Sequence, residues 1–136
     1  MFLVDTDVLS ALRRRERHPA VVRWVAAQRT SDLYINVITV GEIERGITQQ
    51  RRVNPTFARE LALWLDRVLI GYNDRILPVD LPAARRWGQL SAMIGHESAD
   101  LLIAATALER GLTVVTRNVR HFEPTGVAVM NPVECG

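Results

Sequence analysis

Short apolar runs alternate along the chain with longer stretches in which apolar residues recur every three or four positions. The short runs predict buried strands at residues 2–4, 33–36, 76–79, 112–115 and 127–130. The clearest is 112–115, an apolar run with β-branched residues that directly follows a helical stretch. Strands that alternate with helices are typical of an α/β fold with a mainly parallel sheet.

Helical spacing and helix-start signals predict helices in the intervals between these runs. We expect them at about 7–15, 20–28, 39–51, 55–68, 83–94 and 99–110. Thr6 or Asp7 is the expected cap of the first helix. Thr39 and Glu42 have the spacing of a capping box at the start of the third. Ser98 is the expected cap of the last.

The length of 136 residues fits one domain, 1–136, with its own core. Its hydrophobic fraction of 48% is ordinary for a globular protein. No apolar run approaches the roughly 18 residues of a membrane span, and the N-terminus lacks the basic segment of a signal peptide. We therefore expect a cytoplasmic protein without membrane contact. Cys135 is the only cysteine and cannot form an internal disulfide.

The formal net charge is +2, and every one of the 17 basic residues is arginine. The absence of lysine excludes mechanisms that need a catalytic lysine. Arginine also suits phosphate recognition, because its planar fork makes paired hydrogen bonds. The clusters 13–15, 51–52 and 85–86 are either contacts to a nucleic-acid backbone or solvated helix ends.

Polar side chains fall where the predicted strands end. Asp5 follows the first strand, Asn118 follows the strand 112–115, and Glu42 and Asp100 lie in the first turns of helices. Parallel α/β sheets bind ligands at the carboxyl ends of their strands, so we expect these residues to meet at one edge. Each of Glu42, Asp100 and Asn118 also has a purely structural explanation, as a helix cap, a dipole partner or a turn residue. Asp5 is harder to explain that way, because a carboxylate at the end of a buried strand is costly without partners.

Crowded carboxylates repel one another, and a divalent cation relieves the repulsion. Ligand sets made only of oxygen favour Mg²⁺, with Mn²⁺ as a possible substitute. Such an ion lowers the pKa of bound water and polarises phosphoryl oxygens. The pattern therefore indicates hydrolysis of phosphodiesters.

Four blocks of sequence occur together in a family order: "LVDTDVLS" at 3–10, "ITVGEIERGI" at 38–47, "ADLLIAATALERGLTVVTRNVRHF" at 99–122 and "VMNP" at 129–132. With these blocks the chain resembles PIN-domain proteins, and more narrowly VapC-type ribonuclease toxins. The resemblance implies a three-layer α/β/α fold and Mg²⁺-dependent endoribonuclease activity. It also implies a homodimer and a VapB-like antitoxin partner, with operator DNA bound only through that antitoxin.

Carried over by position, the resemblance gives Asp5 and Asp100 the role of metal ligands. Glu42 would hold the metal directly or through water and orient the attacking water, and Asn118 would be a further catalytic residue. Possible substrate contacts are Thr6, Thr116, Arg117 and His121. At the position of His121 the family often has a carboxylate, so this site carries less negative charge.

Two other functions fit parts of the pattern. "FLVDTDVLS" also suits a haloacid-dehalogenase-type phosphatase, with Asp5 as nucleophile and Asp7 as general acid. Such enzymes, like phosphoacceptor receiver domains, need a lysine that this chain lacks. The other alternative is a catalytically weak partner of a DNA-binding antitoxin that acts in regulation of its own operon.

Overall fold

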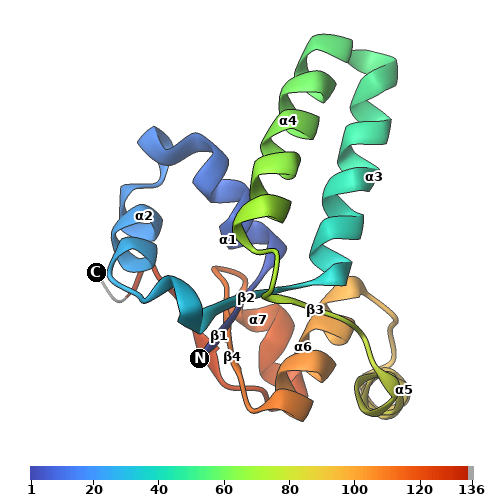
Figure 1. Ribbon diagram of the computed structural model, residues 1–136. Coiled ribbons are helices and arrows are strands. Elements are labelled where there is room, and N and C mark those ends of the chain that lie inside the picture. The colour runs from blue at the N-terminus through green and yellow to red at the C-terminus, as the bar shows by residue number, and fades with distance from the viewer. Residues whose placement is uncertain (135–136) are drawn as a thin grey trace.

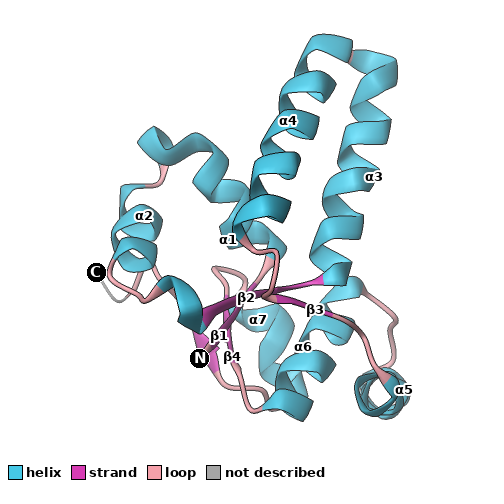
Figure 2. Cartoon of the chain, in the orientation of Figure 1, coloured by secondary structure: helices cyan, strands magenta, loops and turns pink. Residues whose placement is uncertain are grey.

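The computed structural model describes residues 1–134, so Cys135 lies outside the described residues. Five strands form one sheet in the order β3-β2-β1-β4-β5. Figure 2 draws the strands in magenta between the cyan helices. They are β1 (Phe2–Val4), β2 (Leu33–Asn36), β3 (Ile76–Leu77), β4 (Thr113–Val115) and β5 (Val129–Met130). Each pairing between described neighbours is parallel. This confirms the predicted α/β class and its sheet.

Seven α-helices and three short 3₁₀ helices connect the strands in the described part of the chain. The α-helices are α1 (Thr6–Ala11), α2 (Pro19–Ala26), α3 (Val37–Val53), α4 (Pro55–Gly71), α5 (Leu81–Ile94), α6 (Ala99–Arg110) and α7 (Val119–Phe122). The 3₁₀ helices are η1 (Leu12–Arg17), η2 (Thr30–Asp32) and η3 (Glu123–Thr125). None of the described helices is long and apolar enough to cross a membrane.

The helices cover both faces of the sheet, as Figure 1 shows. The α3–α4 hairpin rises from one side together with α1 and α2, while α6 and α7 lie on the other. Alternation along the strands explains the two cores, because successive side chains point to opposite faces. Val4 and Val115 belong to the cluster packed by α1, α3 and α4, whereas Leu3 and Val114 belong to the cluster packed by α6.

Among the described helices, α6 contains the largest number of buried residues. Its residues Leu101, Ile103 and Ala104 are fully buried against the sheet. Gly111 ends the helix in the left-handed conformation, with φ of 65°, which favours glycine. The chain then turns directly into β4, so the start of α6, with Asp100, lies at the carboxyl end of the sheet.

The start and end of the first helix differ from the prediction. Asp5, rather than Thr6 or Asp7, is the cap of α1, because its side chain accepts a hydrogen bond from the backbone N–H of Thr6. The α-helix ends at Ala11 instead of continuing to about residue 15. The following segment is the 3₁₀ helix η1, which Arg14 interrupts with non-helical backbone angles.

The predicted capping box of the third helix was wrong. Helix α3 begins at Val37, and Asn36 caps it by accepting a hydrogen bond from the N–H of Ile38 at 2.9 Å. The same Asn36 side chain donates to the carbonyl oxygen of Leu77 in β3 and to the Thr106 hydroxyl in α6. Thr39 and Glu42 are therefore one turn further into the helix than expected, and their side chains are available for the site described below.

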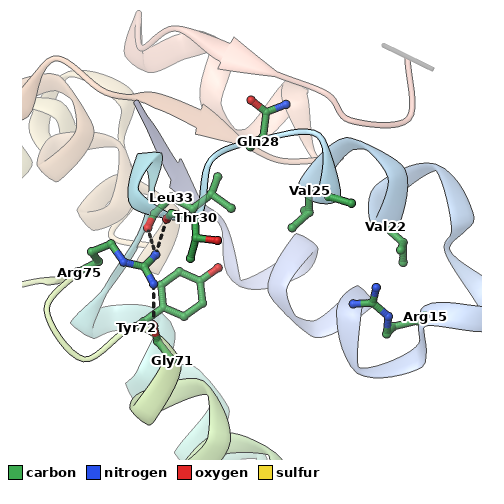
Figure 3. A pocket seen from close by; sticks show the side chains of 10 residues that line it. Arg15, Val22, Val25, Gln28, Thr30, Leu33, Gly71, Tyr72 and Arg75 are labelled. Carbon is green, nitrogen blue, oxygen red and sulfur yellow. Dashed lines mark hydrogen bonds between the residues drawn. The ribbon is translucent and has the colours of Figure 1, made fainter.

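A pocket of about 320 Å³ lies between α2 and the end of α4 (Figure 3). Arg75, from the loop before β3, is buried beside it and donates to the carbonyl oxygens of Thr30, Leu33 and Gly71. This arginine is thus a structural tie between η2, β2 and α4. The pocket has no acidic residue in its lining and adjoins residues that precede β2 and β3, away from the carboxylates.

Candidate active site

Asp5 occupies the centre of the carboxyl edge of the sheet, directly after β1. Its side chain is only 3% exposed. One carboxylate oxygen accepts from the N–H of Thr6 and the other from the hydroxyl of Thr116, each at 2.8 Å. Because a carboxylate oxygen can accept more than one bond, both oxygens retain a free lone pair.

The environment of Asp5 disfavours its ionised form. Burial raises the pKa of Asp5 to about 7, and the nearby charges of Asp100 and Asp7 raise it as well. The hydrogen bonds from Thr116 and Thr6 act in the opposite direction without cancelling the increase. A cation bound beside this carboxylate would remove the penalty for its charge.

Thr116, the buried residue that follows β4, connects Asp5 with Asn118. While its hydroxyl donates to Asp5, it also accepts a hydrogen bond from the backbone N–H of Asn118 at 2.9 Å. Asn118 itself is exposed and precedes α7. The expectation that Asp5 and Asn118 share one edge of the sheet is confirmed by this connection.

Thr6 connects Glu42 to the same edge. The Thr6 hydroxyl lies 2.6 Å from Oε1 of Glu42 and 2.9 Å from the hydroxyl of Thr39. Since Thr6 has a single hydroxyl proton and a carboxylate can only accept, Thr6 donates to Glu42 and accepts from Thr39. Thr39 and Glu42, one turn apart on α3, thus face the start of α1.

Asp100, in the first turn of α6, pairs with His121 of α7. Nδ1 of the imidazole lies 3.0 Å from Oδ2 of Asp100. Because a carboxylate can only accept a hydrogen bond, the proton lies on Nδ1 and Nε2 is left free. The His121 side chain is 60% exposed. Asp100 also acts on Asp5 through charge repulsion, which places the two carboxylates in one electrostatic field.

Arg117 has a partner on α1. Its guanidinium donates to both carboxylate oxygens of Asp7, at 2.9 and 2.8 Å, and its third nitrogen lies 3.2 Å from Nδ1 of His18. The Asp7 partner raises the pKa of Arg117. Asp7 is therefore an ion-pair partner, an environment that does not suit the general acid of the phosphatase alternative.

The carboxylate oxygens at this edge fit a hard divalent cation that binds two carboxylates and keeps several waters. Within residues 1–134, no three His, Cys, Asp or Glu side chains lie close enough to hold one ion together. Asp5 and Asp100 repel each other, and in this range no cationic side chain bonds to Asp5. Mg²⁺ commonly binds one or two carboxylates and keeps several waters. Asp5 and Asp100 would be the two carboxylates in such an arrangement.

The sequence did not reveal several residues that complete this edge. Thr39 was interpreted only as a helix cap, although its spacing from Glu42 places both on one helix face. The pairing of Arg117 with Asp7 joins residues 110 positions apart and has no local signal. Arg120 and His96 line a pocket with Asp100, and no signal in the sequence indicated that they lie beside it.

The fold and the carboxylates at its edge define a class of proteins. The model of the PIN domain family matches residues 2–126. The chain therefore belongs to the PIN domain family, as its resemblance indicated.

Individual relatives agree with this membership over nearly the full length. The VapC ribonuclease Y4jK of Sinorhizobium fredii is 37% identical, with 98% of this chain and 99% of the relative covered. Toxin FitB of Neisseria gonorrhoeae is 35% identical, with 97% and 98% covered. The solved structure of FitAB bound to an IR36 DNA fragment has a TM-score of 0.84 and 34% identity, covering 98% of this chain and 96% of that one.

Proposed function

We propose that the chain is an endoribonuclease, the toxin of a type II toxin-antitoxin system, and that it hydrolyses RNA phosphodiester bonds at the carboxylate edge. The observation that carries this is the buried carboxyl group of Asp5, whose pKa burial raises to about 7 beside the repelling Asp100. A relative named as a VapC ribonuclease at 37% identity supports the reaction class.

Mg²⁺, or Mn²⁺ in its place, is the proposed cofactor, held by Asp5 and Asp100. When bound, it would supply an activated water and neutralise charge on the phosphoryl oxygens. Glu42 is 2.6 Å from the Thr6 hydroxyl, which fixes one oxygen and leaves the other to orient a water. Thr116 keeps the Asp5 carboxylate in one orientation.

Asn118 and His121 are the proposed contacts on the substrate side. Asn118 is exposed just beyond Thr116, and His121 presents Nε2 because Asp100 binds its other nitrogen. Thr6 and Arg117 act through other residues, Glu42 and Asp7 respectively, so we assign them positioning roles.

The test is cleavage of total cellular RNA by purified protein with Mg²⁺, with Mn²⁺ and with EDTA. We expect cleavage with either metal, none with EDTA, and a loss of at least about a hundredfold in Asp100→Ala, since a proposed metal ligand is removed. Asp66→Ala is the matched control, because Asp66 is an exposed aspartate of α4. Sequencing RNA 5′ ends after brief expression of the same variants would identify the target.

A protein that binds its antitoxin and operator but cleaves no cellular RNA under any metal condition would instead be the catalytically weak regulator. Equal cleavage by wild type and Asp100→Ala would show that the activity arises elsewhere, including from a contaminating nuclease.

A VapB-like antitoxin, a homodimer and a cytoplasmic location complete the proposal, with operator DNA bound only through the antitoxin. A DNA-bound FitAB structure with 34% identity to this chain supports the assembly. Leu81 and Met93 of α5, which are 73% and 82% exposed, are apolar residues that a second copy would cover. The expected mass in solution is that of two chains, measured by light scattering for wild type and for Met93→Glu.

A further inference from the structure

Two pockets meet over the short helix α7, beside the carboxylate edge. The first, about 340 Å³, is lined by His96, Ser98, Asp100, Arg120, His121 and Pro124. The second, about 300 Å³, has in its lining Asn118, Asn131 and Glu134 together with Arg120 and His121. Because Arg120 and His121 line both, the two pockets are neighbours, and we name them together the α7 groove.

We propose that the α7 groove binds the phosphate groups of RNA that flank the scissile bond, with Arg120 as their main charged contact. This inference rests on the proposed endoribonuclease function. Asp100 lines one pocket of the groove and Asn118 the other, so the groove borders the edge at which an RNA strand would be cleaved.

Arg120 is the available arginine at this edge. The guanidinium of its neighbour Arg117 already donates hydrogen bonds to both carboxylate oxygens of Asp7. Arg120 is exposed, and within residues 1–134 its side chain has no hydrogen-bond or ion-pair partner. A guanidinium with all its donors free suits the paired oxygens of a phosphate group.

Two imidazoles add hydrogen-bonding groups at the Asp100 end of the groove. Nδ1 of His96 accepts from the N–H of Ser98 at 3.3 Å, which leaves a proton on Nε2 of the neutral ring. His121 is bound through Nδ1 to Asp100, so its Nε2 is also free. These free nitrogens, with the amide of Asn118, line the path along which a sugar-phosphate backbone would run.

The charges in the groove favour an anionic group at Arg120. Asp100 and Glu134 are the acids of its lining, and Arg120 lies between them in the part that both pockets share. A nucleotide chain can place one phosphate at Arg120 and approach Asp100 together with the proposed metal ion.

The experiment measures affinity for a labelled single-stranded RNA of about 16 nucleotides in EDTA, which prevents cleavage, over a range of salt concentrations. Wild type, Arg120→Gln and Arg67→Gln are compared, and Arg67 is an exposed arginine of α4 that provides the charge-matched control. We expect Arg120→Gln to bind about three- to tenfold more weakly and its salt slope to fall by about 0.7, as for one lost phosphate contact. Arg67→Gln should match wild type, and Arg120→Lys should recover part of the loss.

Cleavage of total RNA with Mg²⁺ is measured in parallel on the same proteins. We expect Arg120→Gln to have a higher KM than wild type, with little change in kcat. If wild type cleaves RNA and Arg120→Gln equals Arg67→Gln in affinity, KM and salt slope, the groove proposal is overturned while the nuclease stands. If Arg120→Gln weakens only the capture of a co-expressed antitoxin, the groove belongs to a protein partner and the proposal is overturned too. A wild type that cleaves no RNA with either metal overturns both proposals.

Discussion

Arg117 and Asp7 form a two-pronged ion pair that joins the loop after β4 to the first turn of α1. The two contacts, from Nε and Nη2, are 2.9 and 2.8 Å long, and both side chains are less than one-third exposed. The pair adjoins Asp5 along the chain, because Asp7 is two residues from Asp5 and Arg117 directly follows Thr116, which donates to Asp5. The Arg117–Asp7 pair therefore links the stability of the fold to the geometry of the candidate site.

Arg117→Gln should destabilise the fold by about 1–2 kcal/mol, because paired charge-assisted contacts in a partly buried place exceed ordinary surface ion pairs. Urea denaturation measures the change. Arg86→Gln is the control, since Arg86 makes a single 2.9 Å contact to Glu109 on the surface. Equal effects of the two substitutions would contradict a special role for the Asp7 pair.

Asp5→Asn should stabilise the metal-free protein at neutral pH. Between about pH 4 and about pH 7, the folded wild type holds a proton on Asp5 that the unfolded chain has released, since the pKa rises from 3.8 to about 7. Stability of the wild type therefore falls as pH rises through this window. We expect Asn to remove part of that loss, about 1–3 kcal/mol near pH 8 and close to zero near pH 4.

Urea denaturation in EDTA at a series of pH values measures this difference. Asp66→Asn, on the exposed face of α4, should show no such trend. A stability difference for Asp5→Asn that stays constant with pH would mean that the Asp5 carboxyl group ionises in the fold as it does in the unfolded chain.

Thr6→Val should raise the Mg²⁺ concentration needed for half-maximal RNA cleavage by about tenfold, which is typical when a hydrogen bond to a metal-site carboxylate is lost. The reason is that the Thr6 hydroxyl donates to Glu42 at 2.6 Å. Thr6→Ser retains the hydroxyl and should behave like wild type. If the two variants needed the same Mg²⁺ concentration, the hydrogen bond from Thr6 to Glu42 would have no effect on metal binding.

Asn36→Ala should cost about 2–4 kcal/mol, since it removes a helix cap and the buried hydrogen bonds that its amide donates to the Leu77 carbonyl and the Thr106 hydroxyl. Asn54→Ala is the matched comparison, because Asn54 caps α4 in an exposed position through the N–H of Phe57 at 3.1 Å. It should cost about 1 kcal/mol. Chemical denaturation of both variants checks whether the difference comes from burial; similar losses would mean that capping alone matters.

The strands and the last long helix were predictable because their signals are local. The 2–4 and 33–36 runs became β1 and β2 with the predicted bounds, and α6 runs from Ala99 to Arg110 as expected, with Gly111 at its end. These segments are apolar enough to be buried wherever the sheet lies. Their order along the chain then determines which polar residues reach the carboxyl edge.

The caps and the contacts of the site were not predictable because distant residues decide them. Several candidates for each cap lie within a few positions, and local chemistry does not rank Asn36 above Thr39 or Asp5 above Asp7. In the fold, Thr39 bonds to Thr6, 33 residues away, and Asp7 bonds to Arg117, 110 residues away. Each side chain therefore takes its role from a partner that the local sequence does not show.

The buried side chain of Asn36 fixes the start of α3, the helix that carries Glu42. It begins α3 and at the same time bonds to an edge strand and to the helix behind the sheet. The position of Glu42 relative to the sheet therefore depends on contacts in all three layers. Variation that retunes this enzyme toward a new RNA is consequently expected at the exposed groove and surface positions, while the acids keep their mutual geometry.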